Sequence, residues 1–391
     1  MSDRPSPPAD GLPFEAAVAA TPDFLGAEKL EDGIGLCLSG GGFRSMLFHL
    51  GAFVRMNELG FLPKLDRVAS VSGGSIAAGA LAVAWDQLTF DGKGVATNLA
   101  ELVAQPLLIL SRKYIDVPAI VLGLLPFVHA SRIAAFAYDH YLFHGKTLQS
   151  LPQRPRFSFT ATSLQSGVLW RFARDYAADW RVGMWPNPDI PIALAVGASA
   201  SFPPYLSPAY IDVPEGAIKP QRGADLHNDS YTRRLCLTDG GVYDNLGLEP
   251  VWKRYKTVLV SDGGAVTAPG FAPRTNWLSQ AVRASNIALQ QGVNMRRRVL
   301  LGLERTGERR IAYWGIGDPV ASYGIDNELD FTVEQTRQAA GVATRLTRYP
   351  FAARVNIVRA GYAHCDAALR SSRIELPVSC RPTFDGLPQI L

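Results

Sequence analysis

The chain has 391 residues, of which 47% are hydrophobic and 19% are charged. This composition supports a large buried core and excludes an intrinsically disordered chain. The formal net charge of +4 is too small for the dense basic surface of a nucleic-acid-binding protein, so we expect no nucleic-acid partner. A mildly basic protein does suit an anionic surface such as phospholipid headgroups.

The sequence shows no targeting or membrane-spanning segment. Its first residues, MSDRPSPPADGLP, are polar and proline-rich and lack the plan of a signal peptide. The most apolar run, residues 117–127, contains two prolines and is shorter than the roughly 20 residues that span a bilayer. The four cysteines have no metal-ligand spacing, and Cys37 and Cys236 are predicted to be buried free thiols of a reducing compartment. We expect a cytoplasmic protein, bound peripherally to a membrane if at all, without metal or cofactor.

Predicted strands and helices alternate along most of the chain. The strand 33–38 leads through three glycines into a helix that ends at Gly60, and the strand 67–71 leads into a helix of small residues, 75–85. Further strands are predicted at 156–164, 168–172, 234–238, 257–261 and 353–358, and further helices at 191–200, 276–300 and 333–346. This alternation predicts an α/β fold, a three-layer α/β/α sandwich with a central, mainly parallel sheet.

No repeat or linker divides the chain after its first thirty or so residues. We therefore expect residues 1–32 to be an N-terminal extension and residues 33–391 to form a single domain. Within that domain, the motifs described next lie in a core of residues 33–264, and residues 265–391 complete the fold.

The first motif is Ser70-Val71-Ser72-Gly73-Gly74-Ser75, which joins a strand to a helix of small residues. A serine at such a sharp turn projects its hydroxyl above the sheet edge, where the helix N-terminus favours a developing negative charge. Ser70 stands where the G-x-S-x-G pattern has its first glycine. A helix N-cap by Ser72 or Ser75 explains the local pattern equally well.

The second motif is Ser39-Gly40-Gly41-Gly42-Phe43-Arg44, again between a strand and a helix. Consecutive glycines there can point several backbone N–H groups at one spot, as an oxyanion requires. A phosphate-binding loop is a poor alternative, because neither of the two common glycine-rich nucleotide motifs is present.

The third motif is Leu237-Thr238-Asp239-Gly240-Gly241-Val242-Tyr243-Asp244-Asn245, which places a carboxylate at a strand end. Ligand sites of open α/β sheets form at this edge, although Asp-Gly also marks simple turns. A second copy, Ser261-Asp262-Gly263-Gly264, follows another apolar strand. The local pattern does not distinguish Asp239 from Asp262.

Together and in this order, the three motifs resemble the patatin-like phospholipases, which have a glycine-rich oxyanion loop, a serine elbow and then Asp-Gly-Gly. Weaker similarities occur at Tyr138 to Phe143, Ala161-Thr162, Ala198 to Pro204 and Gly361-Tyr362. The resemblance covers roughly residues 33 to 370. The ordered set is specific, whereas each motif alone is not.

The resemblance implies a role for each matching residue. Ser72 takes the place of the nucleophile, and Asp239, whose motif continues as V-Y-D-N, takes the place of its base. Gly40, Gly41, Gly42 and Arg44 take the places of the oxyanion loop. A Ser–Asp dyad of this kind would hydrolyse lipid acyl esters, as a phospholipase A or lysophospholipase does, and would use no metal.

Two other functions remain open. A Ser–Asp–His triad would need a histidine after Asp239, and His364 is the best placed of the six histidines, although its surroundings favour a helix and a structural surface or groove role. His49, in the first helix, is predicted to be half-buried packing. The chain could also be an inactive lipid-binding or regulatory protein, but the presence of all three motifs argues against that.

Apolar runs between residues 105 and 136 are the remaining feature of note. They could form an apolar rim that meets lipid, but such runs are more often core helices. The sequence thus predicts a phospholipid or another lipid ester as the substrate, and allows peripheral contact with an anionic membrane.

Overall fold

The computed structural model describes residues 30–264, 272, 276–385 and 387. The predicted N-terminal extension lies outside these residues except for its last three. One ten-stranded sheet runs through the molecule in the order β10-β9-β1-β2-β3-β4-β5-β6, and β8 pairs with both β3 and β7. Its strands are β1 (Glu31–Leu38), β2 (Arg67–Val71), β3 (Arg156–Ser163), β4 (Leu169–Ala173), β5 (Tyr176–Asp179), β6 (Gly183–Pro186), β7 (Ala209–Asp212), β8 (Arg234–Asp239), β9 (Tyr255–Asp262) and β10 (Arg310–Gly315).

The sheet is mixed. The five strands β10, β9, β1, β2 and β3 run parallel to one another. The strands β4 to β8 form antiparallel pairs among themselves and with β3. The α/β fold predicted from the sequence is therefore confirmed, with the parallel pairs gathered in one half of the sheet.

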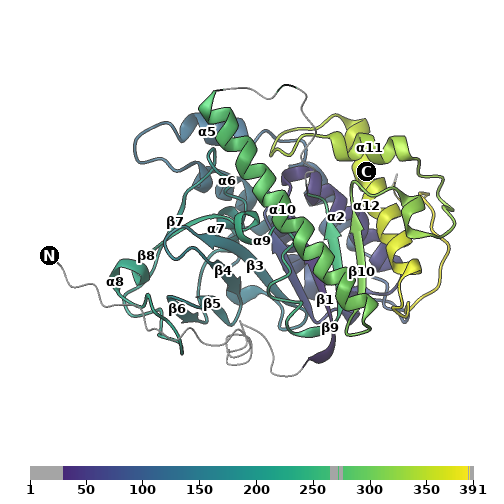
Figure 1. Cartoon of the computed structure of the whole chain (residues 1–391), viewed down its shortest axis with the longest axis horizontal. Helices are drawn as coiled ribbons and strands as arrows, with labels where there is room; N and C mark the ends of the chain where they lie inside the picture. Colours follow the sequence, from purple (N-terminus) through teal and green to yellow (C-terminus); the bar gives the residue numbers. More distant parts are fainter. Residues whose placement is uncertain (1–29, 265–271, 273–275, 386, 388–391) are drawn as a thin grey trace.

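Helices cover both faces of the sheet (Figure 1). They are α2 (Gly42–Glu58), α3 (Gly73–Ala84), α4 (Gln105–Leu110), α5 (Asp116–Leu122), α6 (Ala130–Tyr138), α7 (Ile192–Ser199), α8 (Asp229–Thr232), α9 (Gly241–Asp244), α10 (Trp277–Arg305), α11 (Val333–Gly341) and α12 (Phe351–Ser371). The long α10 crosses one face diagonally. No helix of the described residues is long and apolar enough to cross a bilayer.

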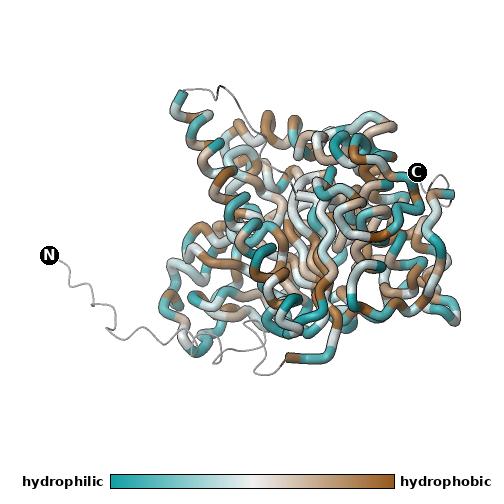
Figure 2. The backbone as a smooth tube through the Cα atoms, turned by 45° about the vertical axis from the view of Figure 1, so that its right-hand side comes forward, coloured by the Kyte–Doolittle hydropathy of each residue, from teal (hydrophilic) through white to brown (hydrophobic). Residues whose placement is uncertain are grey.

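The strands place alternate side chains on opposite faces, as the pleat requires. Leu36 and Leu38 of β1 belong to the core shared with α2, α3 and α12, whereas Cys37 between them packs in a smaller core that includes Val293 and Leu300 of α10. Figure 2 shows hydrophobic residues along the strands at the centre of the molecule. The two cores make the fold a sandwich of three layers.

The predicted strand 353–358 is wrong, because this segment lies inside α12. The run V-N-I-V has the composition of a strand, yet a helix buried over most of its surface shows the same unbroken apolar character. Ile357, Val358 and the residues from Ala360 to Leu369 are all buried. The strand beside β9 is instead β10, which the sequence analysis missed.

Close contact of two backbones joins α12 to α2. A Cβ atom added to Gly51 would lie 2.0 Å from Val358 O, and one added to Gly361 would lie 1.8 Å from Phe48 O. Both distances are far below a van der Waals contact, so the crossing of these helices requires glycine on each. The helix that follows the first glycine loop is thereby held by residues about 300 positions later.

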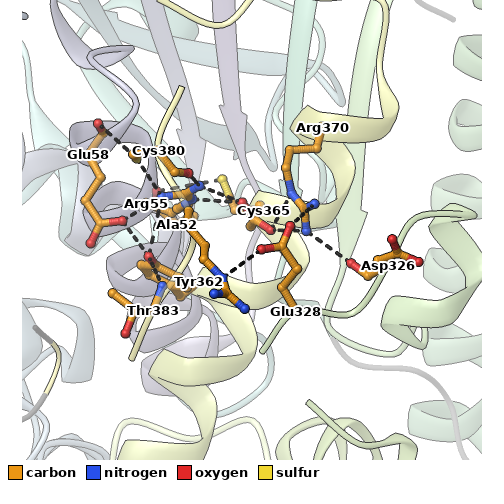
Figure 3. Close-up of polar contacts among 12 residues, drawn as sticks. Ala52, Arg55, Glu58, Asp326, Glu328, Tyr362, Cys365, Arg370, Cys380 and Thr383 are labelled. Carbon is orange, nitrogen blue, oxygen red and sulfur yellow. Dashed lines mark hydrogen bonds and ion pairs between the residues drawn. The ribbon is translucent and has the colours of Figure 1, made fainter. Parts of the chain in front are cut away.

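A buried ionic network strengthens the same contact (Figure 3). The Arg55 side chain is fully buried; it pairs with Asp366 of α12 at 2.8 Å and with Glu58 at 2.8 Å, and donates to Cys380 O at 2.8 Å. Figure 3 shows the ring of Tyr362 beside Arg55. A buried charge with this many partners is costly to disrupt, since removing one partner leaves the other charges uncompensated.

Candidate active site

The pairing of β3 explains how two motifs distant in sequence meet. On one edge of β3, the strand β2 pairs with β3, and the last pair of residues is Val71 with Thr160. From the next residue on, β8 pairs with β3 in the opposite direction, and Asp239 lies opposite Ala161. Since β4 occupies the other edge of β3, β2 and β8 share one edge and their carboxyl ends face each other. Ser72 follows the first strand and Asp239 ends the second.

Ser72 occupies a strained turn. Its backbone has φ 53° and ψ −121°, a conformation that costs a non-glycine residue about 1–3 kcal/mol. The residue is the N-cap of α3, but its side chain makes no capping hydrogen bond. The alternative interpretation of Ser72 as a side-chain cap is therefore wrong, and its hydroxyl is available for another role at the positive end of α3.

Asp239 is buried beside this serine. Its Oδ1 accepts the Gly241 N–H at 2.7 Å, while its Oδ2 is buried and accepts no well-aligned hydrogen bond from the described residues. Burial raises the pKa of Asp239 to about 7, and the Gly241 N–H and the Ser72 hydroxyl oppose this rise. The hydroxyl thus lies near the carboxylate, short of full hydrogen-bond alignment. A carboxylate with a pKa near neutrality is suited to accept a proton.

The glycine loop packs against the serine turn. A Cβ on Gly40 would lie 3.1 Å from Ser72 Cβ, and one on Gly73 would lie 2.0 Å from Gly42 O. Gly40 donates its N–H to Asn245 O at 3.0 Å. The N–H groups of Gly41 and Gly42 donate to no acceptor in the described part of the chain. These two are therefore the loop donors that remain for a ligand.

The buried side chains of Arg44 and His49 hold this loop in place by hydrogen bonds. The Arg44 guanidinium is buried and donates to Gly263 O, to Ala340 O at 2.9 Å and to Val342 O at 2.7 Å. His49 is fully buried and not half-buried as predicted; its Nε2 lies 2.9 Å from Ser39 O and its Nδ1 2.7 Å from Ser261 Oγ. Burial lowers the pKa of His49 to about 4, so the ring is neutral near pH 7.

The end of α7 touches both motifs, and the sequence analysis assigned it no role. Ser199 Oγ accepts the Ser72 N–H at 2.9 Å, and Ser199 O accepts the Gly240 N–H at 3.2 Å. Two residues on, Ser201 O accepts the Asp239 N–H at 3.0 Å. The segment Ser199–Ser201 therefore fixes the separation of Ser72 and Asp239. The only sequence signal was the weak similarity at Ala198 to Pro204.

A cavity of about 830 Å³ opens over these residues. Ser72, Asp239 and the three loop glycines line it together. Its apolar lining comes from Ile120, Ala200, Phe202, Leu206, Leu289, Val293 and Leu346. A cavity of this size with this apolar lining fits an acyl chain.

His364 and Asp262, the alternative candidates for the catalytic site, lie outside this cavity. His364 lies in a helix, as predicted, but it is buried in the core; its Nδ1 lies 2.7 Å from Gly315 O and its Nε2 3.3 Å from Thr336 Oγ1. The prediction of a surface or groove position was wrong. Asp262 accepts hydrogen bonds from the Tyr313 hydroxyl at 2.6 Å and the Gly264 N–H at 2.9 Å. Neither residue lines the cavity over Ser72.

Comparison with protein-family models matches residues 36–252 to the patatin-like phospholipases, more than half of the chain. The chain belongs to the patatin-like phospholipase family. The matched range contains the glycine loop, the serine turn and Asp239, and the family supports a lipid hydrolase function. A search of curated proteins gave no match.

Solved structures of two other proteins are similar to this chain over most of its length. VipD from Legionella pneumophila is 15% identical with a TM-score of 0.38, and the match covers 88% of this chain and 67% of VipD. Human GIVD cytosolic phospholipase A2 is 12% identical with a TM-score of 0.46, covering 89% of this chain and 61% of the human chain. The same human enzyme in complex with a fluorophosphonate inhibitor and terbium chloride is 13% identical with a TM-score of 0.47. This match covers 87% of this chain and 59% of the human chain. This chain thus spans about three fifths of the human structure.

Proposed function

We propose that this protein is a lipid acyl-ester hydrolase of the phospholipase A or lysophospholipase type, with Ser72 as nucleophile and Asp239 as base. One observation carries the proposal. A strained serine and a buried carboxylate with a pKa of about 7 lie side by side in the lining of one largely apolar cavity. The strained backbone of Ser72 and the buried carboxylate of Asp239 both lower the stability of the fold, and residues of this kind are frequent at functional sites.

In the proposed acylation step, Asp239 accepts the Ser72 proton while Oγ attacks the ester carbonyl carbon. The tetrahedral oxyanion receives hydrogen bonds from the Gly41 and Gly42 N–H groups, and the start of α3 adds positive potential. When the intermediate collapses, the protonated Asp239 returns the proton to the departing alcohol. Arg44 and Gly40 position the loop in this scheme, since their donors are already engaged.

In the second step, water replaces the alcohol and Asp239 accepts its proton. This water attacks the acyl-enzyme carbonyl, and as the intermediate collapses the protonated Asp239 returns the proton to Ser72 Oγ, which releases the fatty acid and restores both residues. The same residues would serve an acyltransferase if a second alcohol took the place of water. The mechanism assigns no step to a metal or a cofactor.

Labelling with a fluorophosphonate, followed by mass spectrometry of lipid products, tests the proposal. We expect one covalent adduct on Ser72 and release of free fatty acid from phospholipid or lysophospholipid by the purified protein. A well-folded protein that takes no label on Ser72 and releases no fatty acid would favour an inactive lipid-binding protein.

We expect His364→Gln to keep turnover on a short-chain nitrophenyl ester within about threefold of the wild type. The ring of His364 packs in the core against Phe48 and Phe331, so its loss should cost about 1–3 kcal/mol of folding stability and no chemistry. Circular dichroism should show a lower Tm beside the nearly unchanged kcat. A folded His364→Gln protein without activity would replace the dyad with a triad.

Asp262→Asn should likewise keep most of the activity. Its carboxylate is engaged by Tyr313 and Gly264 at the end of β9, away from the cavity. This variant is a matched control for Asp239, because both residues end a strand and precede two glycines. Steady-state kinetics on the same ester would measure it. The base would be misassigned if folded Asp262→Asn were inactive and Asp239→Asn were active.

We also propose that the chain from residue 33 onward acts as one catalytic domain. The packing of α12 on α2 supports this, because the glycine contacts and the Arg55 network join the two ends of that range.

A further inference from the structure

We propose that an exposed apolar surface around the cavity entrance, the apolar mouth, docks on an anionic lipid bilayer. We define the apolar mouth as Val121, Leu124, Leu125, Phe127, Phe202 and Tyr205. The proposal rests on the proposed function, because it names the surface by which a lipid ester would reach Ser72.

The apolar mouth is unusually exposed for its chemistry. Phe127 is 99% exposed and Leu124 81%, and both lie in the turn between α5 and α6. Val121, Leu125 and Tyr205 are each more than half exposed. A monomeric protein rarely leaves neighbouring large apolar side chains in water, unless the patch contacts a partner or a membrane.

The same surface is continuous with the cavity. Ile120 of α5 lines the cavity, as do Phe202 and Tyr205 of the loop after α7. The ring of His129, at the start of α6, lies tilted against the ring of Tyr210, with the ring centroids 5.0 Å apart, which brings the α5–α6 turn beside β7. An acyl chain leaving a bilayer at the apolar mouth would therefore enter the cavity without crossing water.

The basic residues near the start of α5 favour an anionic surface. Between residues 102 and 138 the only acidic residue is Asp116, and residues 341–365 contain none. Asp116 is paired with Arg345 at 2.8 Å. Burial, and then the nearby Arg112 and Arg348, lowers the pKa of Arg354, so three arginines gather here without a compensating acid in either segment. Each such cation near an anionic bilayer strengthens binding by about fivefold.

The contact between Asp116 and Arg345 also fixes the orientation of the apolar mouth toward the catalytic loop. Arg345 Nε donates to Asp116 Oδ2, and Arg345 O accepts the Phe43 N–H at 2.9 Å, directly after Gly42. Leu346 O accepts the N–H groups of Ile115 and Asp116 at 2.9 and 3.1 Å. The start of α5 and the glycine loop are thus attached to one segment.

Co-sedimentation of the full chain with vesicles tests the proposal. The vesicles are made of ether-linked phosphatidylcholine with or without about one third ether-linked phosphatidylserine, because ether lipids offer no ester to cleave. The variant Leu124→Ser/Leu125→Ser/Phe127→Ser removes the tip of the apolar mouth. Its matched control, Met295→Ser/Val299→Ser/Leu301→Ser, removes three exposed apolar side chains from the far part of α10. A second variant, Arg112→Gln/Arg348→Gln, removes two cations.

We expect the wild type to sediment with the anionic vesicles, the apolar-mouth variant to bind at least tenfold more weakly, and the α10 control to bind as the wild type does. Arg112→Gln/Arg348→Gln should lose most of the preference for phosphatidylserine. Equal binding by the apolar-mouth variant and the wild type, equal loss in the control, or no vesicle binding by the wild type would each overturn the proposal.

Hydrolysis of a water-soluble nitrophenyl ester separates this proposal from the proposed function. The apolar-mouth variant should hydrolyse that ester at the wild-type rate, since no substituted residue belongs to the catalytic machinery. Absent hydrolysis by the wild type would contradict the proposed function, whereas the vesicle assay is read independently. A second copy of the chain could cover the apolar mouth in place of a bilayer, and light scattering tests this alternative. A dimer that dissociates in the apolar-mouth variant would assign the surface to a second copy of the chain and overturn the proposal.

Discussion

Ser72→Ala is expected to lower kcat on a short-chain nitrophenyl ester by about 10³-fold or more. The substitution removes the one hydroxyl that stands at the strained turn, lines the cavity and lies beside Asp239. Folding should be unaffected, because the Ser72 side chain caps no helix and its N–H can still donate to Ser199 Oγ. Steady-state kinetics and circular dichroism would measure the two effects.

Ser75→Ala is the matched control. Ser75 lies three residues later in the same helix, is fully buried and bonds to Ser70 and Ser199 away from the cavity. We expect it to lose less than tenfold in kcat. Near-wild-type turnover by a folded Ser72→Ala protein would contradict the assignment of the nucleophile.

Asp239→Asn should lower kcat by a similar factor, because the amide keeps the shape of the carboxylate but accepts no proton. In the wild type, kcat/KM should rise with pH through about 7 and then level off, since the base acts only when it is ionised. Rate measurements between pH 5 and 9 would show this limb. A profile that stays flat through pH 7 would argue against Asp239 as the base.

The same residue should make stability depend on pH in the opposite sense. The pKa of Asp239 is about 7 in the fold, against about 3.9 in an unfolded chain. The folded state therefore binds the extra proton, and the free energy of unfolding should fall as pH rises from about 4 to 7, by up to a few kcal/mol. Asp239→Asn removes this ionisation. Its Tm should exceed that of the wild type at pH 8 and approach it at pH 4 in thermal melts, a trade of activity for stability.

The residues of the candidate site could be predicted from the sequence because each stands in a local motif. A serine, a glycine run and an Asp-Gly-Gly at strand ends imply geometry over a few residues only. The sequence did not reveal that β2 and β8 meet on one edge of β3, since register between distant strands depends on tertiary packing. The preference for Asp239 over Asp262 came from the family resemblance alone.

Residues that act across the fold were harder to find. Ser199 reaches the Ser72 N–H and Arg345 reaches the Phe43 N–H, and neither stands in a motif that has a known chemistry. Arg44 matched the oxyanion loop by position, yet its guanidinium is engaged by three backbone carbonyls. The helix α12 was mistaken in part for a strand, because a helix buried on nearly all sides loses the amphipathic pattern that identifies it.

The backbone carbonyls that hold the glycine loop determine when the site can form during synthesis of the chain. The backbone carbonyls of Ala340, Val342 and Arg345 accept hydrogen bonds from Arg44 and Phe43, so the loop is held in place by residues that are made about 300 positions after it. At about 5–20 residues per second, those partners appear roughly 15 to 60 s after the loop itself. Until then the nascent chain carries the serine and its base without a fixed oxyanion loop. Ester hydrolysis at Ser72 would therefore begin only after residues 340–345 have been made and have packed against the glycine loop.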